Sequence, residues 1–172
     1  MSREFEQYIG MTGKPTVSPP VESDMIRRFS QAIMDNDPTY YDEEYARQSK
    51  FGAVVAPPLF PLHVLRRRPG TPDPLQSVID NPDADGSADA GAVLAELPAV
   101  PTPLKRRLNG GSEIEFYRCV RLGERVVATP RYHSITAKKS KGADMLVIVT
   151  ETRFTTEGGD LLVISRQTSL RR

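Results

Sequence analysis

The residues of this sequence best suited to chemistry lie between Phe29 and Leu65. This stretch contains a loop dense in Asp and Tyr, at residues 35–42, whose carboxylates and phenols are groups able to take part in proton transfer. The same stretch holds a Gly turn, a short apolar run and two successive prolines, so it indicates an architecture as well as a site.

Other classes of site find little support. One cysteine, Cys119, and two separated histidines, His63 and His133, make no metal-ligand pattern. The glycine pairs at 110–111 and 158–159 lack the spacing of phosphate-binding loops and are predicted as turns. A net charge of +1 argues against nucleic-acid binding. The sequence therefore predicts neither a metal nor a nucleic-acid partner.

Length and composition favour one soluble domain over residues 1–172. A single cysteine fits a reducing compartment. The first residues contain no apolar leader, and no apolar run approaches the roughly 18 residues of a membrane-spanning helix. A cytoplasmic protein without a membrane partner is the expectation.

Three helices are predicted around the chemical stretch. The first begins at an N-cap, Ser23, and ends near Met34, before the Asp-Asn-Asp-Pro run. The second is short and polar, from Asp42 to Lys50. The third begins at Pro57 and Pro58 and runs to Leu65. Because it is apolar over most of its circumference, we expect it to be buried.

The rest of the chain divides into a long excursion and a sheet. Residues 69–103 are rich in Pro and Asp and predict either a disordered insertion or a lid or partner-binding segment, with a helical turn near Leu75 to Ile79. Four strands follow in an antiparallel meander, with a bulge at Pro130. Their ranges are Ser112 to Arg118, Glu124 to Ile135, Met145 to Thr155, and Leu161 to Leu170. This order predicts an α+β domain, with the antiparallel sheet wrapped around the helix at 57–65.

Three motifs in this order resemble a MaoC-like hydratase/dehydratase of the hotdog fold, of the type found as the N-terminal half or accessory subunit. The first, FSQAIMDNDPTYY at 29–41, is similar to the family's helix followed by D-x-N-P-x-H. The second, FGAVVAPPL at 51–59, resembles F-G-x-x-x-x-H-G-M, and the third is NGGSEIEFYRCVRLG at 109–123. The resemblance implies action on acyl-thioesters of coenzyme A or acyl carrier protein, with water added or removed across the 2,3 bond. It implies no cofactor beyond the thioester carrier itself.

Several positions depart from the family's motif. Asp35 is kept, but Tyr40 stands where the family has its His, and Asp37 replaces the motif Asn. A phenol with a pKa of about 10 is a poorer base at neutral pH than an imidazole of about 6.5. The family's His-Gly oxyanion turn falls within Ala56-Pro57-Pro58, and proline has no N–H.

These departures predict a non-catalytic accessory subunit of a heteromeric (R)-specific 2-enoyl-thioester hydratase or dehydratase. A partner hotdog subunit would supply the intact Asp/His pair, while this chain would form part of the acyl-thioester tunnel. In the resembled branch such partners occur with long fatty acyl or steroid side-chain thioesters. Two alternatives stay open: a free-standing homodimeric hydratase with an altered site, and a non-enzymatic acyl-thioester binding or assembly protein. A hotdog thioesterase is a weaker option. The candidate substrate-binding residues are Asp35, Asp37, Tyr40, Ala56, Pro57, Pro58 and His63.

Each candidate also has a structural interpretation. Asp35 is suited to capping a helix end or turn, and Tyr40 to packing. His63 would be a core or interface residue, and His133 a structural residue in a strand. Two basic groups could meet an anionic carrier or simply face solvent. They are Lys138, Lys139 and Lys141, at a hairpin turn, and Arg66 to Arg68 with Lys105 to Arg107, on either side of the excursion.

Overall fold

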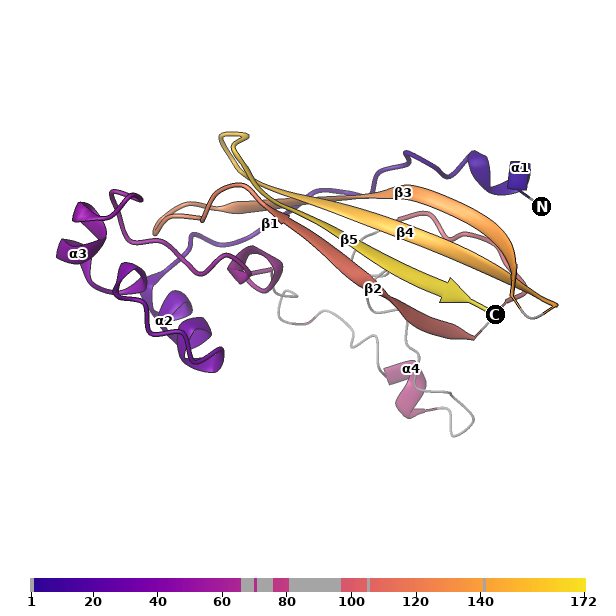
Figure 1. Ribbon diagram of the computed structural model, residues 1–172, viewed down its shortest axis with the longest axis horizontal. Helices are drawn as coiled ribbons and strands as arrows, with labels where there is room; N and C mark the ends of the chain where they lie inside the picture. The colour runs from indigo at the N-terminus through magenta and orange to yellow at the C-terminus, as the bar shows by residue number, and fades with distance from the viewer. Residues whose placement is uncertain (1, 66–69, 71–75, 81–96, 105, 141) are drawn as a thin grey trace.

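The computed structural model of the chain describes residues 2–65, 70, 76–80, 97–104, 106–140 and 142–172. Its centre is a five-stranded antiparallel sheet in the order β1-β3-β4-β5-β2 (Figure 1). The strands are β1 (Thr16–Val17), β2 (Arg107–Phe116), β3 (Val126–Ser140), β4 (Ala143–Thr156) and β5 (Leu161–Arg171). The four long strands confirm the predicted ones, and β1, in a proline-rich segment, pairs with β3 at the edge of the sheet. The architecture is the α+β one expected from the sequence.

The strand order corrects the predicted meander. Strands β3, β4 and β5 do follow one another through hairpins, but β2 pairs with β5 and not with β3. The chain after β2 is held elsewhere, because residues 120–122 run antiparallel to residues 54–56. Val55 bridges to Arg121, and the Ala56 N–H donates to the Val120 carbonyl over 2.9 Å. Along this segment the chain passes from β2, at one edge of the sheet, to β3, on the other side of β4 and β5.

The bulge in β3 is also in a different place from the one predicted. Pro130 lies within the regular pairing, opposite Thr152, and its carbonyl accepts from the Gly13 N–H over 3.0 Å. The register shifts between Tyr132 and Ser134 instead, so His133 occupies the bulge. A proline is tolerated here because only the short edge segment of residues 12–17 lies beyond this part of β3.

The helices are short. They are α1 (Ser2–Glu6), α2 (Ser23–Ala32), η1 (Pro38–Tyr40), α3 (Glu43–Gln48), η2 (Phe60–Leu62) and α4 (Gln76–Ile79). Helices α2 and α3 lie at one end of the sheet and α1 at the other (Figure 1). The sequence did not predict α1, and Glu22 rather than Ser23 takes the N-cap position of α2. None of these helices, in the part of the chain that is described, has the length and apolar character to cross a membrane.

The predicted buried helix at 57–65 is wrong. Only the single 3₁₀ turn η2 forms there. Three prolines in five residues, at 57, 58 and 61, remove the N–H groups on which a regular α-helix depends. Phe60 and Val64 are buried as expected, but His63 is exposed, so of the two placements predicted for it, core or interface, the core one is wrong.

Two apolar clusters hold the fold together. The larger lies where α2, residues 54–64 and one end of the sheet meet, and it contains Val21, Ile26, Ala46, Val54, Ala56, Phe60, Val64, Val120, Val126, Ala128, Phe154, Leu162 and Val163. The smaller lies at the other end of the sheet and contains Phe5, Tyr132, Ile135, Leu146 and Ile148. We call the face of the sheet on these clusters the inner face, and the opposite face the outer face.

The end of the predicted excursion belongs to the fold. Leu97, Val100 and Leu104 pack on the smaller cluster, and the Tyr132 hydroxyl donates to the Pro98 carbonyl over 2.8 Å. Helix α4 confirms the predicted helical turn. The remaining residues up to 96, together with Arg66 to Arg68, Lys105 and Lys141, lie outside the described residues. Lys138 and Lys139 are exposed at the end of β3.

Candidate functional site

The candidate site begins where α2 ends. The Met34 N–H donates to the Gln31 carbonyl over 3.2 Å, and the Asp35 N–H donates to the Ser30 carbonyl over 3.0 Å. This pair of bonds is a Schellman motif, which needs a left-handed residue just past the helix. Met34 takes that position with φ 57° and is 86% exposed. The turn reverses the chain and sets Asp35 beside the body of the domain.

Glycine should replace Met34 with a gain in stability. A non-glycine residue in the left-handed region costs on the order of 1 kcal/mol, and so exposed a side chain contributes little packing that could be lost. We expect Met34→Gly to raise the free energy of unfolding by about 0.5–1 kcal/mol, measured by urea denaturation of the isolated chain. Gln31→Gly, in the regular part of the same helix, is the control and should lower it. A loss of stability in Met34→Gly would show that the methionine makes a contact that offsets its strain.

The structure brings Asp35 and Tyr40, the two positions of the family's Asp/His motif, together. The Tyr40 hydroxyl donates to Asp35 Oδ2 over 3.2 Å, and the Asp37 N–H lies 3.3 Å from Asp35 Oδ1. Asp35 is half-buried, and Tyr40 packs against the larger apolar cluster. The carboxylate is therefore held in place by the group that replaces the family's histidine.

The protonation state of Tyr40 decides what this pair can do. Burial, together with the negative charge of Asp35 and the hydrogen bond to it, raises the pKa of Tyr40 to about 12. The phenol is protonated throughout the physiological range and acts as a donor to Asp35. It does not accept a proton from water there, so the pair has no general base corresponding to imidazole.

Asp37 has a structural task in this loop. Its Oδ1 accepts from the Thr39 N–H over 2.9 Å and from the Thr39 hydroxyl over 2.8 Å, and it caps η1. These bonds hold the pKa of Asp37 below its ordinary value. Thr39, which the sequence did not single out, is buried, and its carbonyl accepts from the Val55 N–H over 3.2 Å. The Asp-Pro-Thr run, a typical Asx turn, is the signal that could have indicated its role.

The second part of the site is the segment Ala56–Pro58. The Ala56 N–H is already bonded to the Val120 carbonyl, and Pro57 and Pro58 have no N–H. Stabilising an oxyanion requires donors aimed at the developing charge. None of these three positions has a free backbone donor. The structure thus agrees with what the sequence predicts for this turn.

His63 stands apart from the carboxylate in sequence but next to α2 in space. Its ring lies 5.3 Å from the Phe29 ring at an angle of 36°, and Phe29 meets Phe60 edge to face at 5.5 Å. Phe29 belongs to the same helix whose end carries Asp35. His63 is exposed, so the only histidine near the site lies at its surface.

The arrangement lacks two of the chemical parts that hydration requires. It offers a fixed carboxylate, a phenol donor and an apolar wall, without a base of suitable pKa or an oxyanion donor at 56–58. Across the described residues, no three His, Cys, Asp or Glu side chains gather closely enough to hold a metal ion. Burial also raises the pKa of the Cys119 thiol, so it is a poor nucleophile at neutral pH.

Comparison with known proteins places this site in a family. The model of the FAS1-like dehydratase domain region matches residues 7–164. A probable enoyl-CoA hydratase alpha subunit of Thermomonospora curvata is 28% identical, over 98% of this chain and 51% of that protein.

Solved structures share the fold. The ChsH1-ChsH2 complex from Mycobacterium tuberculosis matches with a TM-score of 0.64 and 21% identity, over 93% of this chain and 83% of that chain. A MaoC-like dehydratase from Rhodospirillum rubrum matches with a TM-score of 0.60 and 20% identity, over 95% and 93%. The predicted hotdog fold is confirmed, and the chain belongs to the FAS1-like dehydratase-region family, with the hotdog fold of MaoC-like hydratases and dehydratases.

Proposed function

We propose that this chain is the non-catalytic subunit of a heteromeric 2-enoyl-thioester hydratase or dehydratase. The observation that carries the proposal is the double loss at the site. Tyr40 is a locked donor with a pKa of about 12, and Ala56–Pro58 offers no free N–H. Each loss removes one requirement for adding water to an enoyl-thioester, so catalysis needs residues from another chain.

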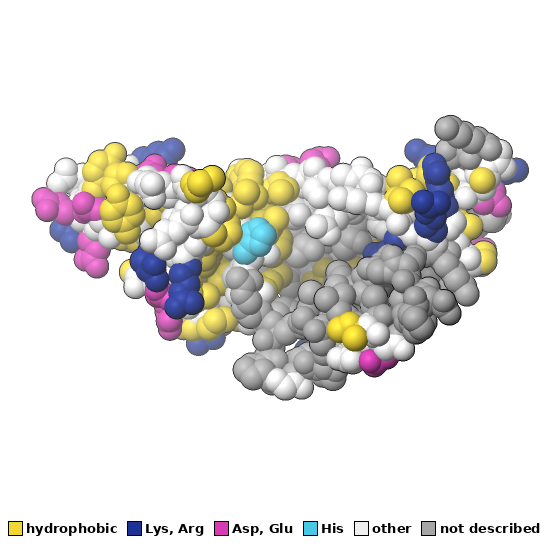
Figure 2. Space-filling model, turned by 90° about the horizontal axis from the view of Figure 1, so that it is seen from below, with side chains coloured by type: hydrophobic (Ala, Val, Ile, Leu, Met, Phe, Trp, Pro, Cys, Tyr) yellow, Lys and Arg dark blue, Asp and Glu magenta, His cyan; other side chains and the backbone are white. Residues whose placement is uncertain are grey.

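The partner in this proposal is a second hotdog subunit with an intact Asp/His motif. Support comes from the matched relatives, which include a protein named as a hydratase alpha subunit and a complex of two different chains. It also comes from apolar side chains exposed on either side of the site, at Ile33 (41%), Met34 (86%), Tyr41 (62%) and Leu59 (38%). Figure 2 shows apolar side chains at the end of the molecule that carries α2 and α3. Such a patch is typical of an interface.

The substrate in this proposal is an acyl-thioester of coenzyme A or acyl carrier protein, with no separate cofactor. Asp35, Tyr40, Pro57, Pro58 and His63 would form one wall of the acyl tunnel. Asp37, whose carboxylate is engaged with Thr39, would support that wall through the loop.

Co-purification tests the partner. The tagged chain, expressed in its source organism, should retain a hotdog protein of similar size with the Asp/His motif, and the complex should hydrate a 2-enoyl-CoA. Met34→Asp, which places a charge in the exposed patch, should reduce the retained partner at least about tenfold. Asp144→Lys, beside the β3–β4 hairpin at the opposite end of the sheet, is the control. Retention of no hotdog protein by the wild-type chain would contradict the proposal.

A second candidate is a homodimeric hydratase that uses Asp35 with His63. It is favoured by one observation, the exposed His63 ring stacked on the helix that leads to Asp35. It requires hydration by the purified chain alone and a loss of at least about 100-fold in His63→Ala. Binding of an acyl-CoA without turnover, even in the complex, would instead favour an assembly or binding protein.

A further inference from the structure

The outer face of the sheet carries a row of alternating charges. Glu113, Arg166, Glu151 and Arg131 stand directly opposite one another on β2, β5, β4 and β3. Arg166 donates to Glu113 over 2.9 Å and to Glu151 over 2.8 Å, and Arg131 donates to Glu151 over 2.9 Å. Arg166 also bonds Glu115, two residues along β2. We call the four residues in line the charge ladder; it reads minus, plus, minus, plus across the sheet.

The two central residues of the ladder are largely shielded from solvent, and its two end residues are exposed. The Glu151 side chain is only 1% exposed and Arg166 is 23% exposed. At the two ends, by contrast, Glu113 is 69% and Arg131 is 40% exposed. Each end charge has a partner on one side only, along the ladder, and a large solvent-facing surface. The ends are the positions at which a further charge of opposite sign would be received.

The order of the charges selects the occupant. Read from β2, the signs of the ladder run minus, plus, minus, plus; read from β3, they run plus, minus, plus, minus. A second copy turned end for end therefore places a positive charge opposite a negative one at every position. A two-fold axis parallel to the strands and running between β4 and β5 makes this reversal. It sets Glu113 against Arg131 of the second copy and Arg166 against Glu151. A two-fold axis across the strands would set each charge against its like.

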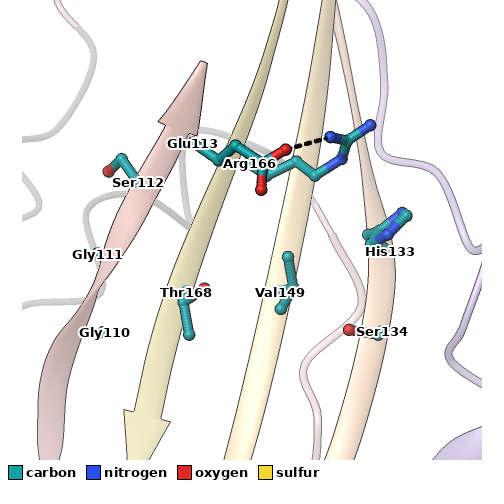
Figure 3. A pocket seen from close by; sticks show the side chains of 9 residues that line it. All are labelled: Gly110, Gly111, Ser112, Glu113, His133, Ser134, Val149, Arg166 and Thr168. Atoms are coloured by element: carbon teal, nitrogen blue, oxygen red, sulfur yellow. Dashed lines mark hydrogen bonds and ion pairs between the residues drawn. The ribbon is translucent and has the colours of Figure 1, made fainter. Parts of the chain in front are cut away.

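The surface beside the ladder suits a close approach. The next row holds only small side chains, Gly111, Thr168, Val149 and Ser134. It forms an open hollow of about 660 Å³, with Val149 and Thr168 on its floor and the Arg166–Glu113 pair as one wall (Figure 3). Gly110 keeps β2 close to this floor, because a Cβ there would lie 2.6 Å from Thr168 Cγ2.

The part of this face around the ladder is also electrically balanced. Three carboxylates, at Glu113, Glu115 and Glu151, accompany three guanidinium groups, at Arg131, Arg166 and the exposed Arg153. Two such faces have no net repulsion to overcome. An isologous contact of this kind is the commonest route to a symmetric assembly.

We propose that the outer face is a docking surface for a second copy of this chain, packed sheet to sheet about a two-fold axis parallel to the strands. The surface lies on the opposite side of the sheet from α2 and η2, so it is independent of the subunit proposed above. The assembly it predicts contains two copies of this chain in addition to any other partner.

Charge reversal at the ends of the ladder tests the proposal. Glu113→Arg alone and Arg131→Glu alone each place like charges together twice in every pair of copies. Each variant should raise the dissociation constant for self-association at least about tenfold, measured by sedimentation equilibrium. An equal mixture of the two variants restores opposite charges at both ends. The mixture should therefore regain the mass that each variant has lost, although neither chain has recovered its own internal ion pairs.

Two further measurements keep the test decisive. Glu157→Arg makes the same charge change as Glu113→Arg on a hairpin away from the ladder and should leave the mass unchanged. If circular dichroism shows that Arg131→Glu does not fold, Glu113→Arg against Glu157→Arg decides alone, because Glu113 is largely exposed. A wild-type chain without a two-copy step, or a mixture that stays dissociated, overturns the proposal.

Discussion

The isolated chain is expected to hydrate a 2-enoyl-CoA no faster than the buffer does. A positioned general base typically contributes about 10²–10⁴-fold to the rate, and one oxyanion donor about 10²–10³-fold. Tyr40, with a pKa of about 12, does not supply the first, and Ala56–Pro58 does not supply the second. If the two losses are independent, the site falls short by roughly 10⁴-fold or more. Loss of the conjugated enoyl-thioester absorbance measures the rate.

Two variants sharpen this expectation. Asp35→Ala should be as inactive as the wild-type chain, since there is no turnover to lose. Tyr40→His restores an imidazole beside Asp35 but should still fall about 10²–10³-fold short of an intact site, because the oxyanion donor is missing. In the complex with the proposed partner, Asp35→Ala should leave turnover within about threefold of wild type. Turnover by the chain alone that Asp35→Ala abolishes would contradict the non-catalytic role.

The largest stability effect is expected from Glu151→Ala. Glu151 is buried beneath Arg131 and Arg166, and their hydrogen bonds outweigh the opposing effect of burial and hold its pKa below the ordinary value. Removing one partner from a buried ion pair costs about 3–5 kcal/mol. Because Arg131 is 40% exposed and can regain water, we expect the lower end, about 3 kcal/mol. In thermal unfolding this corresponds to a fall in Tm of roughly 6–12 °C.

Acid provides a second readout for the same residue. A carboxyl whose folded pKa is lowered stabilises the protein above its unfolded value, about 4.3, and this contribution disappears as the pH falls through the folded pKa. The stability of Glu151→Ala should therefore fall less steeply than that of the wild type below about pH 4. Glu157→Ala, at an exposed carboxylate 3.8 Å from Arg125, should change neither quantity measurably. A Glu151→Ala protein within about 1 kcal/mol of wild type would show that the arginines find other partners.

The sequence predicts the sheet well and the central helix badly, for different physical reasons. Strands β4 and β5 are rich in apolar and β-branched residues and are bounded by glycine turns, so local pattern and final structure agree. The 57–65 segment has enough apolar residues to suggest a buried helix. Phe60 and Val64 are buried, as this pattern predicts, but the prolines limit the backbone to one 3₁₀ turn. The missing backbone N–H groups therefore decided the secondary structure of this segment, and its apolar pattern decided only which side chains are buried.

Strand pairing and the burial of individual side chains cannot be predicted from such local patterns. The pairing of β2 with β5 depends on residues 54–56 meeting residues 120–122, a contact between segments far apart in the chain. The Asp35–Tyr40 contact was predictable, since both residues lie in one short loop. The raised pKa of Tyr40 was not, because its chief cause is burial. The charge ladder was not predictable either, since its four members come from four strands whose register the sequence does not state.

The register shift in β2 affects how readily a single chain aggregates. In the described structure this strand hydrogen-bonds to β5 alone and is thus an outer strand of the sheet. Outer strands invite uncontrolled pairing with other chains, and an irregular backbone discourages it. The register shift between Asn109 and Gly111, with Gly111 at φ 109°, interrupts the strand near its beginning. This irregularity therefore disfavours fibrous aggregation through β2 while that edge of the sheet is uncovered.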